Sequence, residues 1–136
     1  AINYRGDLLR ITLFAMNASL VTWTVLDWVD VFVMDAYRKV ITDSLAFCQQ
    51  RKGLRVHGWV IMTSEVQLVV SAAPAALLRD IMRDSKAFTS SEIHRHLRYG
   101  PDEEEPRKRW MVEKMVRAGR ANPANYEFQL WQQVYE

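Results

Sequence analysis

Two apolar runs separated by only two residues constrain the fold of this chain more than any other feature. The runs are residues 54–62 (LRVHGWVIM) and 65–71 (EVQLVVS), and Thr63 and Ser64 separate them. A two-residue connection fits a tight β-hairpin, so we predict two paired strands, both largely buried. Neither connecting residue is Gly or Asn, which leaves the turn type open.

The strongest helical pattern in the chain precedes this hairpin. Tyr37, Ile41, Leu45 and Cys48 follow helical spacing, and Gly53 stands where a helix-ending glycine belongs. We therefore predict a helix over 35–52, with Asp35 as its N-cap. Before it, residues 20–28 (LVTWTVLDW) are rich in β-branched and aromatic side chains, which predicts a first strand.

Three helices and a last strand are predicted after the hairpin. Pro74 suits the first turn of a helix over 75–88, and Ser90 or Ser91 suits the cap of a short helix reaching Leu97. The first of these helices carries an apolar face of Leu77, Leu78, Ile81, Met82 and Ser85. Pro106 opens a further helix that Gly119 closes, and residues 126–134 read as a strand. This order predicts a single α+β domain over 1–136, a ferredoxin-like antiparallel sheet with helices on one face.

Composition excludes several classes of protein. The 136 residues are 49% hydrophobic and 25% charged, which is typical of a folded domain rather than a disordered or fibrous chain. A net charge of +2 does not by itself indicate nucleic-acid binding. Cys48 is the only cysteine, so an internal disulfide is impossible and a reducing compartment is favoured. Residues 11–21 imitate a signal peptide only loosely, and no run approaches the roughly 20 apolar residues that span a bilayer. We expect a cytoplasmic protein without a membrane partner.

Common catalytic motifs are absent. The chain has no phosphate-binding GxxxxGK[ST] loop, no GxGxxG turn and no GxSxG elbow. His94 and His96 stand two apart, and helix residues at that spacing point away from each other, so they are unsuited to chelating one ion. His57 is predicted to be a hydrogen-bonded core histidine.

Several segments between Trp23 and Gln133 resemble one protein family in order and spacing. They are TWTVLDWVDVF, YRKVITDSLAFCQQRKGL, HGWVIMTSEVQLVV, LLRDIMRDSKAFTSSEI, RKRWMVEKMVRAG and FQLWQQ. Together they resemble the REP-associated tyrosine transposase-like proteins of the HUH single-strand transposase superfamily. The resemblance covers about 110 residues and leaves residues 1–19 without a counterpart.

The resemblance implies a ferredoxin-like core that acts on single-stranded or hairpin-folded DNA. Two histidines of the family's hairpin strand hold a divalent ion, Mg²⁺ or Mn²⁺, and a tyrosine on a later helix attacks the phosphate. In this chain the two histidine positions fall on Glu65 and Gln67. These residues share one strand face and have oxygen donors that Mg²⁺ accepts, yet one carboxylate makes a poor site. We therefore expect no bound cofactor.

The family's nucleophile also has no counterpart before Glu136. Tyr126 and Tyr135 precede its expected position, and we interpret both as packing or terminal aromatics. The family's helix that carries the nucleophile is therefore missing from the alignment. Members of the family commonly act as dimers, so a homodimer is expected.

Basic residues recur at helical spacing in the second half of the chain. Such rows suit phosphate binding, although acidic residues interleave with them and the acidic run 102–105 lies beside them. The candidate DNA-binding residues are Arg79, Arg83, Lys86, Arg95, Arg98, Lys108 and Arg109. Trp110 and Trp131 are candidates for base stacking, whereas Trp23, Trp28 and Trp59 are predicted in the core or at an interface.

Three functional hypotheses follow. The leading one is a transposase-like domain that binds single-stranded or hairpin DNA without cleaving it. The second is an active metal-dependent transposase or nuclease that uses Glu65 and Gln67. The third is a dimeric interaction module that needs no DNA.

Overall fold

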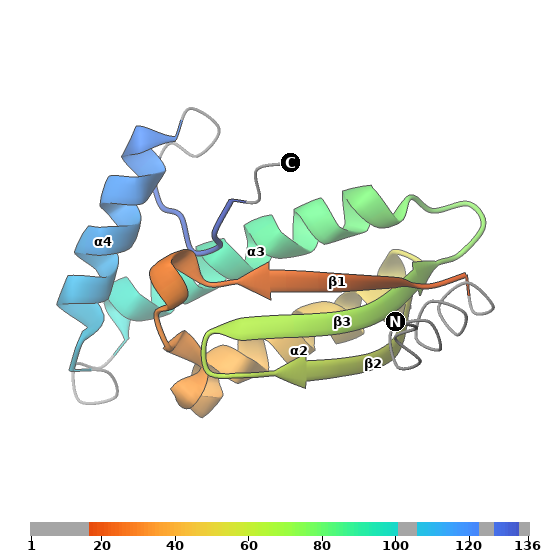
Figure 1. The fold of residues 1–136 in the computed structure, drawn as a ribbon, viewed down its shortest axis with the longest axis horizontal. Helices are drawn as coiled ribbons and strands as arrows, with labels where there is room; N and C mark the ends of the chain where they lie inside the picture. Colours follow the sequence, from red (N-terminus) through yellow and green to blue (C-terminus); the bar gives the residue numbers. More distant parts are fainter. Residues whose placement is uncertain (1–16, 101–105, 123–126, 134–136) are drawn as a thin grey trace, which may run out of the picture.

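The computed structural model describes residues 17–100, 106–122 and 127–133. Its sheet has three antiparallel strands, β1 (Ser19–Thr24), β2 (Leu54–Ile61) and β3 (Glu65–Ala72), in the order β1-β3-β2. Trp131 adds a single antiparallel bridge to Val25 beyond β1. The resulting order, with the Trp131 segment, β1, β3 and β2 side by side, agrees with the predicted ferredoxin-like type (Figure 1).

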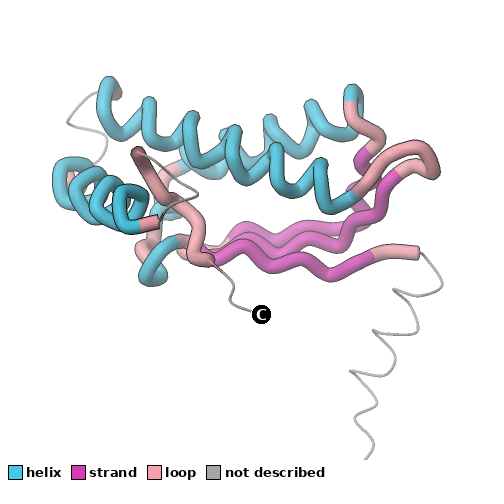
Figure 2. The backbone as a smooth tube through the Cα atoms, turned by 90° about the horizontal axis from the view of Figure 1, so that it is seen from above, coloured by secondary structure: helices cyan, strands magenta, loops and turns pink. Residues whose placement is uncertain are grey.

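Three helices accompany the sheet, α2 (Asp35–Arg51), α3 (Leu78–Tyr99) and α4 (Lys108–Ala121). Figure 2 shows the helices on one side of the sheet, and within the described ranges no element covers its other face. The core lies between these layers. There Val66, Leu68 and Val70 of β3 are buried together with Ile41 of α2 and Ile93 of α3. The predicted α+β class is confirmed.

The predicted hairpin and first helix are confirmed. Residues 62–64 connect β2 to β3, and the amide of Met62 donates to the carbonyl of Glu65 at 2.8 Å. Gly53 follows α2 with a φ of +78°, a value that favours glycine because it has no Cβ. Asp35 is not the N-cap, because it is already the first residue of α2 and Met34 precedes it as the cap.

The prediction that both hairpin strands are largely buried is wrong for β2. This strand lies at the edge of the sheet, and Trp59 and Val60 are exposed. His57 is not a core residue either. It sits at a register shift between Val56 and Gly58 and is exposed, and its Nε2 lies 2.8 Å from the hydroxyl of Ser71.

The two helices predicted over 75–88 and 91–97 are one continuous helix, α3. Ser90 and Ser91 lie inside this helix and are not N-caps. The helix continues because its buried face extends through Thr89, Ile93 and Leu97. The hydroxyl of Thr89 donates to the carbonyl of Ser85 at 2.8 Å, which satisfies it inside the helix. Pro74 lies in a turn before α3 rather than in its first turn. Leu77 was predicted on the buried face of the helix, but it precedes α3 and is exposed.

The prediction that Gly119 ends the last helix is wrong, because Gly119 lies inside α4. A Cβ there would lie 2.5 Å from the amide nitrogen of Phe128, so only glycine allows this close approach. The predicted last strand is mostly irregular over 127–133, with one bridge at Trp131. Tyr126, Tyr135 and the acidic run 102–105 lie outside the described residues.

The first strand is shorter than predicted. It ends at Thr24, and two short 3-10 turns, η1 (Leu26–Trp28) and η2 (Val31–Val33), follow it. Asp27 and Trp28 have φ values of +50° and +56°, which are incompatible with a strand.

Candidate nucleic-acid interface

The predicted metal residues lie on the sheet face opposite the helices. Val66 and Leu68 point into the core, so strand alternation turns Glu65 and Gln67 to the other side, beside Thr24 and Thr22 of β1. The side-chain amide nitrogen of Gln67 donates to the carboxylate of Glu65 at 3.4 Å. The two residues therefore share a face, as predicted.

This donor set offers a divalent metal ion only one charged ligand. Glu65 is one carboxylate, and its neighbours Gln67, Thr22 and Thr24 offer only neutral groups. Within the described ranges no three His, Cys, Asp or Glu side chains come together as ligands. Mg²⁺ is usually bound by one or two carboxylates together with substrate phosphates and water, so Glu65 alone would supply only part of such a site.

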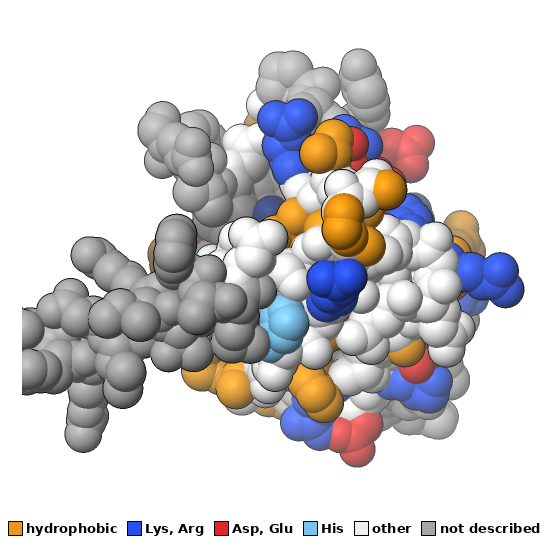
Figure 3. Space-filling model, turned by 90° about the vertical axis from the view of Figure 1, so that its right-hand side faces the viewer, with side chains coloured by type: hydrophobic (Ala, Val, Ile, Leu, Met, Phe, Trp, Pro, Cys, Tyr) orange, Lys and Arg blue, Asp and Glu red, His pale blue; other side chains and the backbone are white. Residues whose placement is uncertain are grey.

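The candidate DNA-binding residues fall into two groups. Arg79, Arg83 and Lys86 lie on the first half of α3, at the end of the molecule seen in Figure 3. On the visible part of that face, Lys and Arg side chains are scattered among neutral, apolar and acidic ones. This end therefore offers no concentrated positive surface.

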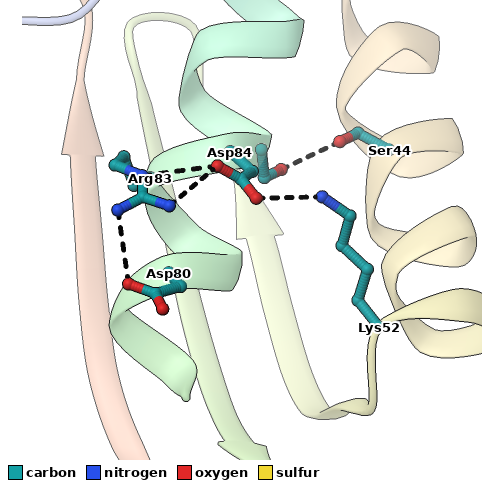
Figure 4. A network of polar contacts seen from close by, with 6 residues as sticks. Ser44, Lys52, Asp80, Arg83 and Asp84 are labelled. Carbon is teal, nitrogen blue, oxygen red and sulfur yellow. Dashed lines mark hydrogen bonds and ion pairs between the residues drawn. The ribbon is translucent and has the colours of Figure 1, made fainter. Parts of the chain in front are cut away.

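Arg83 is also engaged within the protein. Figure 4 shows its guanidinium between Asp80 and Asp84, with 3.3 Å contacts to both carboxylates. Lys52, the residue directly after α2, contacts Asp84 at 3.1 Å, and its hydrogen bond holds the pKa of Asp84 below the ordinary value. The buried hydroxyls of Ser44 and Ser85 meet at 2.8 Å beside this network. The group therefore joins α2 to α3 rather than presenting free positive charge.

Lys86 is half-buried, and burial lowers its pKa. With Arg83 and Ser90 it lines a hollow against residues 130–133. Trp131 is only 6% exposed there, and its indole N–H donates to Thr89 at 3.1 Å. The predicted stacking role of Trp131 is therefore not supported by its burial.

The second group of predicted cations comes together between α3 and α4. One hollow there is lined by Arg98, Lys108 and Arg109, and a neighbouring hollow by Arg95, Arg98 and Arg120. Arg98 lines both, so the two hollows form one surface, which we call the α3–α4 basic surface. Five cationic side chains line this surface, and its two acidic side chains are Glu113 and Glu127. The exposed Tyr99 lies at its edge.

His94 forms part of this surface in its neutral form. Its ring stacks on Phe128 with centroids 4.1 Å apart, and its Nε2 accepts a hydrogen bond from Nε of Arg98 at 2.5 Å. Burial first, and the charge of Arg98 second, lower the pKa of His94. The ring therefore orients Arg98 without adding charge at neutral pH. Arg95 is less available, because it pairs with Glu92 at 2.8 Å.

Helix α4 is the most basic element described. Residues 106–122 contain six Lys or Arg and one acidic residue, Glu113. Two of these cations dock the helix, since Lys114 contacts Asp27 at 2.8 Å and Arg107 contacts Asp30. Arg107 holds the pKa of Asp30 below its ordinary value. Lys108 donates to the carbonyl of Gly100, just after α3, at 2.6 Å. The remaining cations of this stretch are Arg109, Arg117 and Arg120.

The tryptophans differ in their exposure. Trp23 is buried, as predicted, at 3% exposure. Trp28, Trp59 and Trp110 are 66%, 57% and 52% exposed, so Trp28 and Trp59 are not in the core, and their predicted alternative position at an interface stays a prediction. Trp110 keeps the exposure that its predicted stacking role requires. The sequence did not identify Arg120 as a DNA-binding candidate, although Arg120 follows Arg117 at helical spacing. It did not identify Trp28 as a stacking candidate either.

Comparison of the sequence with models of known families finds no match, and neither does comparison with curated proteins. The transposase resemblance therefore remains a prediction. None of the described helices has both the length and the apolar character that crossing a membrane would require.

Proposed function

We propose that this domain binds single-stranded or hairpin DNA through the α3–α4 basic surface and does not cleave it. The observation that carries the proposal is the convergence of five cations from two helices around two adjoining hollows. Lys and Arg side chains that neutralise phosphates supply most of the sequence-independent affinity of such proteins. The resemblance to single-strand transposases is a separate argument for the same class of ligand.

The absence of cleavage in this proposal rests on the chemistry of Glu65 and Gln67. A metal ion assists cleavage by polarising the phosphate or activating a nucleophile, and a single carboxylate holds such an ion poorly. The carboxylate of Glu65 also repels a phosphate. The domain would therefore bind DNA as a recognition module.

A labelled hairpin DNA titrated at 50 and 200 mM salt, with Mg²⁺ and with EDTA, tests this function. We expect binding that weakens steeply with salt and is unaffected by EDTA. Strand cleavage that requires Mg²⁺ and is lost in Glu65→Ala would support the metal-dependent transposase or nuclease instead. No binding in any condition would refute the proposed function.

A second candidate function is self-association through β2. This strand forms an edge of the described sheet and exposes Trp59 and Val60, and the exposed Met62 directly follows it. Exposed edge strands pair readily with other chains. Analytical ultracentrifugation at several protein concentrations measures whether the protein forms a homodimer. A dimer that Val60→Lys dissociates would support this interface, whereas a monomer at all concentrations would contradict it.

A further inference from the structure

Two exposed tryptophans lie on segments that are bonded to each other. Trp28 lies in η1 between Asp27 and Asp30, and Trp110 lies in α4 between Arg107 and Lys114. Because Lys114 pairs with Asp27 and Arg107 pairs with Asp30, these two ion pairs hold the segments side by side. Figures 1 and 2 likewise place the turns after β1 next to α4.

The backbone around Trp28 is held in an unfavourable conformation. Asp27 and Trp28 both have positive φ, and the amide of Val29 donates to the carbonyl of Leu26 at 3.2 Å. Positive φ at both central residues is the pattern of a type I′ turn, which prefers Asn or Asp followed by Gly. A bulky side chain in the second position is a steric outlier.

The surrounding structure maintains this turn. The amide of Asp27 donates to the side chain of Gln132 at 3.1 Å, and the amide of Leu26 donates to the carbonyl of Leu130 at 2.8 Å. The ring of Trp28 is nevertheless 66% exposed, so core packing does not account for tryptophan at this position. Strain of this kind concentrates at functional sites.

A cation lies beside the second tryptophan. Nζ of Lys114 lies 5.7 Å from the ring centroid of Trp110, and the other cations of α4 lie on the same helix. An exposed indole among cations is the combination by which proteins bind single-stranded nucleic acid, with phosphates held by charge and bases stacked on rings.

We propose that Trp28 and Trp110 form a stacking platform for unpaired nucleobases, which makes the domain select single-stranded over fully duplex DNA. This inference rests on the proposed function and adds the feature of the DNA that is selected. Bases in a duplex are stacked on one another, so only an unpaired nucleotide offers its face to an indole. The cations of α3 and α4 would hold the adjoining phosphates.

The test compares one labelled oligonucleotide, alone and annealed to its complement, with wild type, Trp28→Gly and Trp110→Ala. Glycine at position 28 removes the ring and relieves the backbone, so misfolding would not explain a loss. We expect each variant to bind the single strand about 5- to 150-fold more weakly, corresponding to about 1–3 kcal/mol, with little change for the duplex. Trp110→Phe should recover part of the loss, and Phe47→Ala is the control for an exposed aromatic side chain elsewhere, on α2.

The outcomes separate the two proposals. Wild type that binds neither DNA refutes the proposed function itself. Wild type that binds DNA, while Trp28→Gly and Trp110→Ala keep its affinity for the single strand, overturns the stacking platform alone. Variants that lose self-association but keep single-strand binding would assign the two rings to a protein interface instead.

Discussion

Gly119→Ala tests how the C-terminal segment packs against α4. In an open helix this substitution stabilises by about 1 kcal/mol, because glycine is the more flexible residue when unfolded. Here the new Cβ would lie 2.5 Å from the nitrogen and 2.8 Å from the Cα of Phe128. Ordinary contacts need about 3.4 Å or more, so the backbone of the segment must retreat by about 1 Å.

That retreat has two costs. Overpacking of this kind destabilises by about 1–3 kcal/mol. The amide of Gln129, which donates to the carbonyl of Met115 at 2.9 Å, would also be pulled from its partner, at about 1–3 kcal/mol for buried groups. Subtracting the gain in helix propensity leaves a predicted loss of about 1–5 kcal/mol.

Urea denaturation followed by circular dichroism measures this loss. Gly58→Ala is the matched control, since a Cβ at Gly58 meets nothing within 4 Å and its φ is not in the left-handed region. We expect the control to change stability by less than about 1 kcal/mol. A Gly119→Ala protein as stable as wild type would refute the packing of residues 127–133 against α4.

Two further predictions concern stability. Trp28→Gly should have a free energy of unfolding about 1 kcal/mol higher than Trp28→Ala, because position 28 has positive φ. In helices and strands the alanine variant is normally the more stable of the two. Equal stability of the two variants in urea denaturation would count against the strained turn. The lowered pKa of His94 predicts stability that is fully present above about pH 6.5 and falls as the pH drops through the lower folded-state value. In His94→Gln this part of the pH dependence should vanish, and an unchanged difference in unfolding free energy between pH 7.5 and pH 5 would contradict the assignment.

The fold was largely predictable where local patterns decide it. Two sequence patterns identify elements that the structure confirms: the helical spacing of Tyr37, Ile41 and Leu45, and the two apolar runs that form β2 and β3. The boundary errors arise where tertiary contacts override local signals. Ser90 looks like a helix cap, yet α3 continues because buried residues on both sides keep packing. Gly119 looks like a helix end, yet it admits a neighbouring backbone.

The candidate site was only partly predictable. Helical spacing identified cationic rows, but it cannot show that Arg98 faces α4 while Arg83 is held by Asp80 and Asp84. Likewise, an apolar run does not reveal which tryptophans stay exposed. The exposure of Trp28 follows from a turn with positive φ at a residue where glycine would be expected.

The dependence of DNA affinity on salt tests the α3–α4 basic surface most directly. Each phosphate contact with single-stranded DNA contributes about 0.7 to the slope of log affinity against log salt. Removing two contacts with the double variant Arg98→Ala/Arg109→Ala should therefore lower the slope by about 1.4. The double variant Arg51→Ala/Arg55→Ala removes the same charge from exposed positions at the other end of the sheet and should leave the slope nearly unchanged. Equal losses in the two variants would contradict a localised DNA-binding surface between α3 and α4.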